Sequence, residues 1–122
     1  MALFHQVNLD ITMIIKTTLI KKPFQAITVW PVIFVLPDQA DNVGLLEHEL
    51  VHYREQAWIA PLWWLRYVLS KSFRLAAEVR AYKRQIEVGG ITRLTAAAML
   101  LNYGLGITLE QALQKLPESP GP

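Results

Sequence analysis

The chain has 122 residues and a formal net charge of +2, and 52% of its residues are hydrophobic. This length supports one domain with a substantial core but not two, and the composition is globular rather than disordered. The sequence contains no cysteine, so disulfide bonds, thiolate metal ligands and cysteine nucleophiles are excluded. We predict a single domain over residues 1–116, followed by a flexible tail over residues 117–122.

Charge and the amino-terminal pattern bear on partners and location. Basic residues gather between Arg66 and Arg93, but they fall at helical intervals among apolar residues, as on a solvated helix face. We therefore expect no nucleic-acid partner. Residues 1–9, followed by Asp10, do not have the pattern of a signal peptide, which favours a cytoplasmic protein.

Two segments before residue 37 have the composition of β-strands. Residues 11–20 are rich in β-branched side chains and predict a strand, although their apolar positions also fit a helical stripe capped by Asp10. Residues 26–36 predict a second strand, which Pro31 assigns to a sheet edge or a bulge because proline cannot donate a ladder hydrogen bond. An extended peptide can pair with an edge strand, but an ordinary edge that binds nothing is the simpler interpretation.

The rest of the chain is predicted to be mainly helical. Asp41 or Asn42 caps a helix over residues 43–59, and Pro61 stops it. Further helices are expected over residues 72–88, from Thr92 or Thr95 to about Tyr103, and over residues 109–116 with a Thr108–Gln111 capping box.

The most apolar region covers residues 58–69. It is too short to span a bilayer and is interrupted by Pro61 and Arg66, so no transmembrane segment is expected. Its tryptophans and tyrosine are residues that favour membrane interfaces. Core packing is the preferred interpretation, and contact with a membrane surface is the alternative.

The predicted helix over residues 43–59 carries the run His48-Glu49-Leu50-Val51-His52. Histidines four residues apart lie one helical turn apart, about 6 Å along the axis, and point the same way. Two imidazoles so placed can share one metal ion, and Glu49 projects beside it, where it can take a proton from a bound water. This spacing is typical of a zinc hydrolase site.

A hydrolytic zinc site usually takes three protein ligands, so a third ligand is required. The remaining histidine, His5, lies in a stretch with no recognisable pattern, which favours a carboxylate. Glu55 lies one turn beyond His52 on the same helix, Glu47 lies well round that helix, and Glu87 belongs to the polar face of its own helix. None of these three is well placed to converge with both histidines.

Glu78 differs because it lies within an apolar helical stripe. The stripe consists of Leu75, Val79, Tyr82 and Ile86. A lone carboxylate on a buried face is costly unless it is paired or binds a metal, so we predict Glu78 as the third ligand. The alternative explanations are a salt bridge to Arg54, Arg66 or Arg74, or a stripe that is less buried than its pattern indicates.

This assignment constrains the segment between the two helices. An immediate antiparallel return after residue 59 would regain the level of His52 near residue 68. Glu78 lies about ten residues later, which is roughly 15 Å of helix. Residues 58–69 must therefore form a separate turn or short helix, with a break before Ser72.

With these residues the sequence resembles the gluzincins, zinc metallopeptidases with a His-Glu-x-x-His helix and a glutamate ligand on a following helix. The resemblance covers about residues 27–85 and is strongest to minimal, single-domain members. It implies one zinc ion held by His48, His52 and Glu78, with Glu49 as general base. It also implies that the strand before the metal helix binds extended substrate, here through Val32, Ile33, Phe34 and Val35.

The expected fold is α+β, with a small antiparallel sheet or hairpin that has an edge strand and packs on a zincin-like core of about four helices. The chain is shorter than a full gluzincin and lacks the second subdomain that closes the cleft. Residues that stabilise the transition state in larger members have no firm counterpart, and Tyr82 and Tyr103 are the candidates.

We therefore predict a zinc-dependent hydrolase that acts on a peptide or amide bond of a peptide or protein substrate. A zinc-stabilised binding or regulatory module without turnover is the alternative, favoured by the missing subdomain and the tryptophan-rich segment. A metal-free helical domain with a chance motif is the third interpretation. Two imidazoles and a carboxylate can also hold iron, nickel or manganese.

Overall fold

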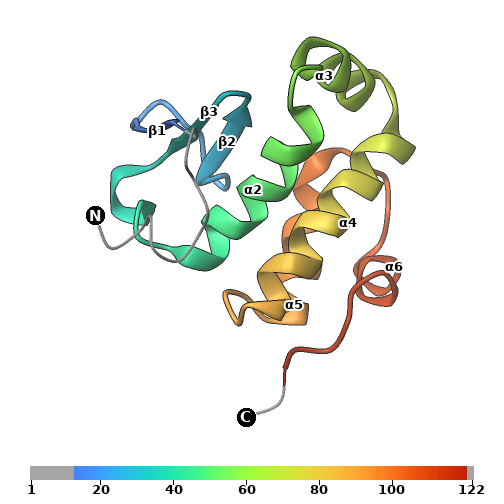
Figure 1. Cartoon of the computed structure of the whole chain (residues 1–122). Coiled ribbons are helices and arrows are strands. Elements are labelled where there is room, and N and C mark those ends of the chain that lie inside the picture. Colours follow the sequence, from blue (N-terminus) through green and yellow to red (C-terminus); the bar gives the residue numbers. More distant parts are fainter. Residues whose placement is uncertain (1–12, 121–122) are drawn as a thin grey trace.

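A small β-sheet and a group of helices lie on opposite sides of one central helix, α2 (Val43–Gln56), in the computed structural model, which describes residues 13–120 (Figure 1). The strands are β1 (Met13–Lys16), β2 (Ala26–Val29) and β3 (Val32–Val35). The other helices are α3 (Ala60–Leu69), α4 (Lys71–Glu87), α5 (Arg93–Leu100) and α6 (Leu109–Gln114), with 3-10 turns η1 (Pro37–Gln39) and η2 (Leu101–Tyr103). The predicted α+β class is confirmed.

The sheet is mixed, with the order β1-β3-β2. β2 and β3 form an antiparallel hairpin, and β1 pairs in parallel with the other edge of β3. The single strand expected over residues 26–36 is therefore two strands. Pro31 lies in the turn between them, where no ladder hydrogen bond is required of it. Residues 11 and 12 of the first expected strand lie outside the described residues.

The expectation that Val32–Val35 forms a sheet edge is wrong. β3 is the central strand, paired on both sides, and its Ile33 and Val35 side chains are completely buried. Its backbone groups are used within the sheet, so they are not free to pair with a peptide. Among the described strands, the edges are β1 and β2, and β2 is the edge strand that packs against α2.

The segment between the two long helices forms a separate helix, as the position of Glu78 requires. α2 ends at Gln56, three residues before the expected position, and Trp58 follows with a left-handed φ of 66°. Pro61 lies in the first turn of α3, a position that proline favours. Ser70 then breaks the chain direction and caps α4 by accepting a hydrogen bond from the Phe73 amide.

The carboxy-terminal part packs on the far side of α4. Thr92 caps α5, and Thr108 and Gln111 form the predicted capping box at the start of α6. Within the segment expected to be a tail, Glu118 and Ser119 contact Arg93, and residues 121–122 lie outside the described residues.

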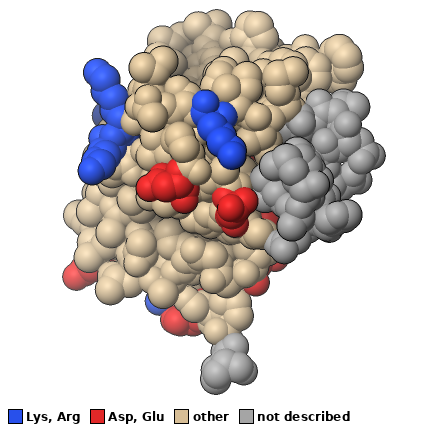
Figure 2. All heavy atoms as spheres, turned by 90° about the vertical axis from the view of Figure 1, so that its left-hand side faces the viewer, with Lys and Arg blue, Asp and Glu red and all other residues tan. Residues whose placement is uncertain are grey.

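No described helix has the length and hydropathy needed to cross a bilayer. On the face seen in Figure 2, acidic and basic side chains are few and are separated by uncharged surface.

α2 is buried on two sides because the sheet covers one face and α4 the other. Leu46, Leu50 and Tyr53 pack with Ile33 of the sheet. On the opposite side α2 and α4 run antiparallel, since Glu47 pairs with Arg84 and Glu55 with Arg80. This packing brings the histidine-bearing face of α2 against Glu78 of α4.

A contact between two glycines sets the spacing at one end of this helix pair. A Cβ atom added to Gly44 in α2 would lie 2.5 Å from the Cα of Gly90, just beyond α4. Real Cβ atoms essentially never approach another carbon so closely, so only glycine allows the two backbones to meet here. The separation of α2 and α4 therefore depends on this pair.

We predict that Gly44→Ala lowers the free energy of unfolding by about 2 kcal/mol, because the added methyl group forces the helices apart. This direction is diagnostic, since alanine for glycine inside a helix otherwise stabilises by about 1 kcal/mol. Urea denaturation measures the effect. Gly90→Ala should show a similar loss, because its Cβ would lie 2.5 Å from the Cα of Gly44. Unchanged or increased stability of Gly44→Ala would contradict the close approach.

Candidate metal centre

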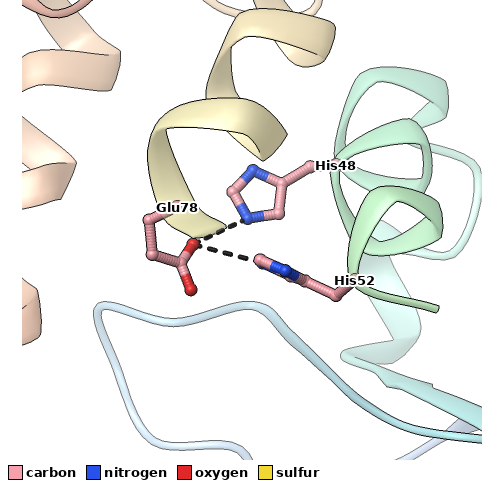
Figure 3. A group of neighbouring side chains, drawn as sticks. All are labelled: His48, His52 and Glu78. Atoms are coloured by element: carbon pink, nitrogen blue, oxygen red, sulfur yellow. Dashed lines mark hydrogen bonds and ion pairs between the residues drawn. The ribbon is translucent and has the colours of Figure 1, made fainter. Parts of the chain in front are cut away.

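His48, His52 and Glu78 converge between α2 and α4 (Figure 3). The Nε2 atoms of His48 and His52 lie 3.2 and 3.3 Å from Oε1 of Glu78. One ligand atom from each residue lies within 4.8 Å of the other two, and all three residues are at least 95% buried. The structure thus brings together the three residues that sequence analysis selected as metal ligands.

The hydrogen bonds of His48 leave its metal-binding nitrogen free. Nδ1 lies 2.9 Å from Oε1 of Gln85, and because an amide oxygen can only accept, Nδ1 donates. In a neutral imidazole Nε2 then carries a lone pair, which faces the carboxylate of Glu78. Two acceptors at 3.2 Å repel each other unless a cation or a proton lies between them. A metal ion meets this requirement, and Gln85 acts as the partner that orients the ligand.

The separations also fit coordination by a small metal ion. Nitrogen and oxygen ligands of zinc lie about 2.0–2.2 Å from the ion, so two ligands in tetrahedral geometry are roughly 3.4 Å apart. The two nitrogen–oxygen distances of 3.2 and 3.3 Å are close to this value. The ligand atoms of all three residues lie within 4.8 Å of one another, so the group could hold a metal ion. The ligand set alone does not select one metal.

Tyr67 of α3 holds the second oxygen of Glu78. Its hydroxyl donates to Oε2 at 2.5 Å, which leaves Oε1 directed at the two histidines. Burial raises the pKa of Tyr67, and the Glu78 carboxylate raises it further, so the hydroxyl remains a donor at neutral pH. Sequence analysis missed this residue, because residues 58–69 were interpreted as apolar packing. The sequence signal was the single hydroxyl group in α3, a helix whose only charged side chain is Arg66.

The charges of the centre stabilise one another. Burial lowers the pKa of His52, but the Glu78 carboxylate, helped by Glu55 and Glu49, outweighs this effect and raises it to about 10. Burial likewise raises the pKa of Glu78, yet the two histidines hold it well below its usual range. Without a metal the centre therefore retains a proton on His52 at neutral pH, and a metal ion must displace it.

Glu49 lies beside the centre but is not one of the three converging ligands. Thr28 of β2 donates through its hydroxyl to Oε1 of Glu49 at 2.8 Å. The other carboxylate oxygen, Oε2, lies 3.8 Å from Nε2 of His48. The edge strand of the sheet thus fixes the orientation of the predicted general base.

A cleft of about 630 Å³ opens next to these residues, between the sheet and the helices. It is lined by His48, Glu49, His52 and Glu78, by Ala26, Ile27 and Thr28 of β2, and by aromatic residues that include Phe24, Trp63, Trp64 and Tyr67. Of the four residues expected to bind substrate, only Phe34 reaches it, whereas Val32, Ile33 and Val35 do not. β2 therefore contributes three residues to the cleft lining and β3 contributes one.

The two predicted transition-state residues have different positions. Tyr103 lines the cleft, whereas Tyr82 does not. The ring of Tyr82 packs edge-on against His48, with ring centroids 4.4 Å apart, and its hydroxyl lies 2.9 Å from that of Tyr103. Burial raises the pKa of both tyrosines, so both are protonated at neutral pH. When Tyr82 is the donor in this pair, the Tyr103 proton is available for a molecule in the cleft, and Tyr82 supports His48 from behind.

Comparison with protein-family models, curated proteins and solved structures gave no match. The assignment of this centre therefore rests on the residues and geometry of this chain.

We predict that the protein binds one divalent transition-metal ion and that Glu78→Gln weakens binding by more than about 100-fold. Loss of a direct ligand should weaken metal binding more than the 10- to 100-fold effect that is typical of losing a residue that hydrogen-bonds a ligand. Tyr67→Phe should fall within that smaller range. Competition with a chromophoric chelator measures the affinities. Glu47→Gln is the matched control, because Glu47 lies on α2 but pairs with Arg84, and its affinity should equal that of the wild type.

Metal affinity should also depend on pH. Because His52 has a pKa of about 10 in the metal-free protein, binding releases about one proton at neutral pH. The apparent affinity should then rise about tenfold for each pH unit between about 6 and 8. Calorimetry in buffers of different ionisation enthalpy counts the released proton. An affinity that does not change over this range would show that His52 is neutral before the metal binds.

Proposed function

We propose that the protein is a zinc-dependent hydrolase that cleaves a peptide or amide bond. The observation that supports this best is the position of Glu49, whose carboxylate lines the cleft beside the three converging ligands. A buried carboxylate held next to a metal centre, but outside its ligand set, is placed to act as a general base. Thr28 holds it there through a hydrogen bond to one oxygen.

The number of donors favours a catalytic over a structural metal. Structural zinc sites are usually closed by four protein ligands, whereas catalytic sites have three and keep a fourth position for water or substrate. Within residues 13–120, the group of metal-binding side chains has three members, and it borders the cleft. A water molecule can therefore approach the fourth position from the cleft.

The chain supplies the acid–base chemistry and the geometry. Zinc held by His48, His52 and Glu78 would lower the pKa of the attacking water and polarise the scissile carbonyl group. Oε2 of Glu49 accepts the proton of that water, because Oε1 is already held by Thr28, and then passes it to the leaving amine. The Tyr103 hydroxyl lies in the cleft wall as a donor for the developing negative charge.

We assign substrate binding to β2 in place of β3. Among the described strands β2 pairs only with β3, but Gln56 occupies its outer edge at the Thr28 carbonyl and the Trp30 amide. An extended peptide can therefore pair with the part of this edge that precedes Thr28. The β2 residues Ala26, Ile27 and Thr28 line the cleft, which places the peptide beside Glu49. The aromatic and aliphatic lining favours substrates with apolar side chains near the cleaved bond.

We predict that Glu49→Gln keeps its metal and loses about 10²- to 10⁴-fold in the rate of hydrolysis, because an amide cannot accept the proton of water. The measurement uses a library of fluorogenic peptides with apolar residues at the central positions, together with elemental analysis of each variant. Glu47→Gln should retain both metal and activity, since Glu47 does not line the cleft.

Two results would contradict the proposal. Hydrolysis that persists in Glu49→Gln would remove Glu49 from the mechanism. A metal-loaded wild type that cleaves no member of the library would favour the alternative function, a metal-stabilised binding module without turnover.

A further inference from the structure

The outer face of α3 exposes a group of large apolar side chains, and Trp58, in the turn before it, is exposed beside Trp30, with ring centroids 4.7 Å apart. The exposed fractions are 84% for Trp58, 48% for Ile59, 54% for Leu62, 56% for Leu65, 65% for Val68 and 75% for Leu69. Soluble single-chain proteins rarely expose apolar patches of this kind without a function. Figure 1 shows α3 at one extremity of the molecule, away from α6. We call these six residues the α3 face.

The exposed leucines of α3 lie on one side of the helix because of their spacing in the sequence. Leu62, Leu65 and Leu69 succeed one another at three- and four-residue intervals and form one stripe along the helix. The opposite side of α3 carries Trp63 and Tyr67, which line the cleft. α3 is therefore apolar on both sides, but the described part of the chain covers only the cleft side.

The charge around this face has one sign. No acidic residue occurs between Glu55 and Glu78, and Glu55 is paired with Arg80 at 2.6 Å. Arg66 on α3 and Lys71 at the start of α4 are both exposed. An exposed apolar stripe with tryptophan at one end and basic residues beside it is the composition of helices that lie in the interface of an anionic membrane.

We propose that the α3 face docks the protein on an anionic lipid bilayer. Apolar side chains would enter the boundary between headgroups and acyl chains, and Arg66 and Lys71 would remain among the headgroup phosphates. α3 has 10 residues, so it is about 15 Å long and lies in the plane of the surface, because a membrane span needs about 30 Å.

Docking would place the metal centre close to the lipid. The ring of Trp63, on the cleft side of α3, lies 5.5 Å from that of His52. Little more than the diameter of one helix, about 10 Å, therefore separates the α3 face from the centre. This inference goes beyond the proposed hydrolysis and does not rest on it, since it uses only the outer surface of α3.

The test is co-sedimentation of the full chain with vesicles. We expect binding to phosphatidylcholine vesicles that contain about 30% phosphatidylserine, and weaker binding to pure phosphatidylcholine. The double variant Leu65→Glu/Leu69→Glu should reduce binding to the anionic vesicles at least about tenfold, because two carboxylates replace apolar side chains that would enter the bilayer. Leu94→Glu/Leu109→Glu is the matched control, since both leucines are exposed on other helices, and it should bind like the wild type.

Two further variants separate the apolar and the electrostatic contributions. Arg66→Gln and Lys71→Gln should each weaken binding to anionic vesicles about fivefold and leave binding to neutral vesicles unchanged. Trp58 is the most exposed of the four tryptophans, so the blue shift of fluorescence on vesicle binding should largely disappear in Trp58→Phe. Circular dichroism of each variant checks that the fold is retained.

Three outcomes would overturn the proposal. The first is a wild type that does not sediment with anionic vesicles. The second is an equal loss of binding in the Leu94→Glu/Leu109→Glu control. The third is a stable dimer in the absence of lipid that Leu65→Glu/Leu69→Glu converts to a monomer, because a second copy of the chain would then cover the α3 face.

Discussion

The contact of one buried carboxylate with two imidazoles is the interaction on which this structure depends. Glu78 lies within 3.3 Å of both His48 and His52, in a region from which water is almost excluded. Such a group is costly in the interior unless its charges are compensated, and a proton or a metal ion is needed to compensate them. Hydrogen bonds from three elements support the centre. Tyr67 of α3 donates to Glu78, Gln85 of α4 accepts from His48, and Thr28 of β2 donates to Glu49 beside the centre.

The helix packing can be understood as the means of holding this centre. α2 and α4 approach closely because Gly44 and Gly90 have no side chains between them. α3 then closes the space between the two long helices and supplies the hydroxyl that orients Glu78. The same short helix carries an exposed apolar face on its other side. Its position thus connects the metal centre, the cleft and the surface that we infer to contact lipid.

Several features could be predicted from the sequence because they depend on local geometry or on the cost of burial. The four-residue spacing of His48 and His52 places them on one helical face whatever the rest of the chain does. Glu78 could be selected because a carboxylate within an apolar stripe requires a partner. The separate helix α3, and the break before α4, followed from the length of chain that must be accommodated between the histidines and Glu78.

Other features were decided only by the tertiary structure, because they depend on which distant segments meet. The pairing of β1 with β3 made β3 the central strand and left β2 as the edge beside the cleft, and no local pattern in residues 26–36 distinguishes these arrangements. Tyr67 is a partner of Glu78 because α3 packs against α4, and the sequence of α3 does not reveal this packing. The sequence by itself thus determined the three candidate metal ligands and the candidate general base. Only the folded chain decided which strand and which hydroxyl accompany them, since strand order and helix packing are long-range properties.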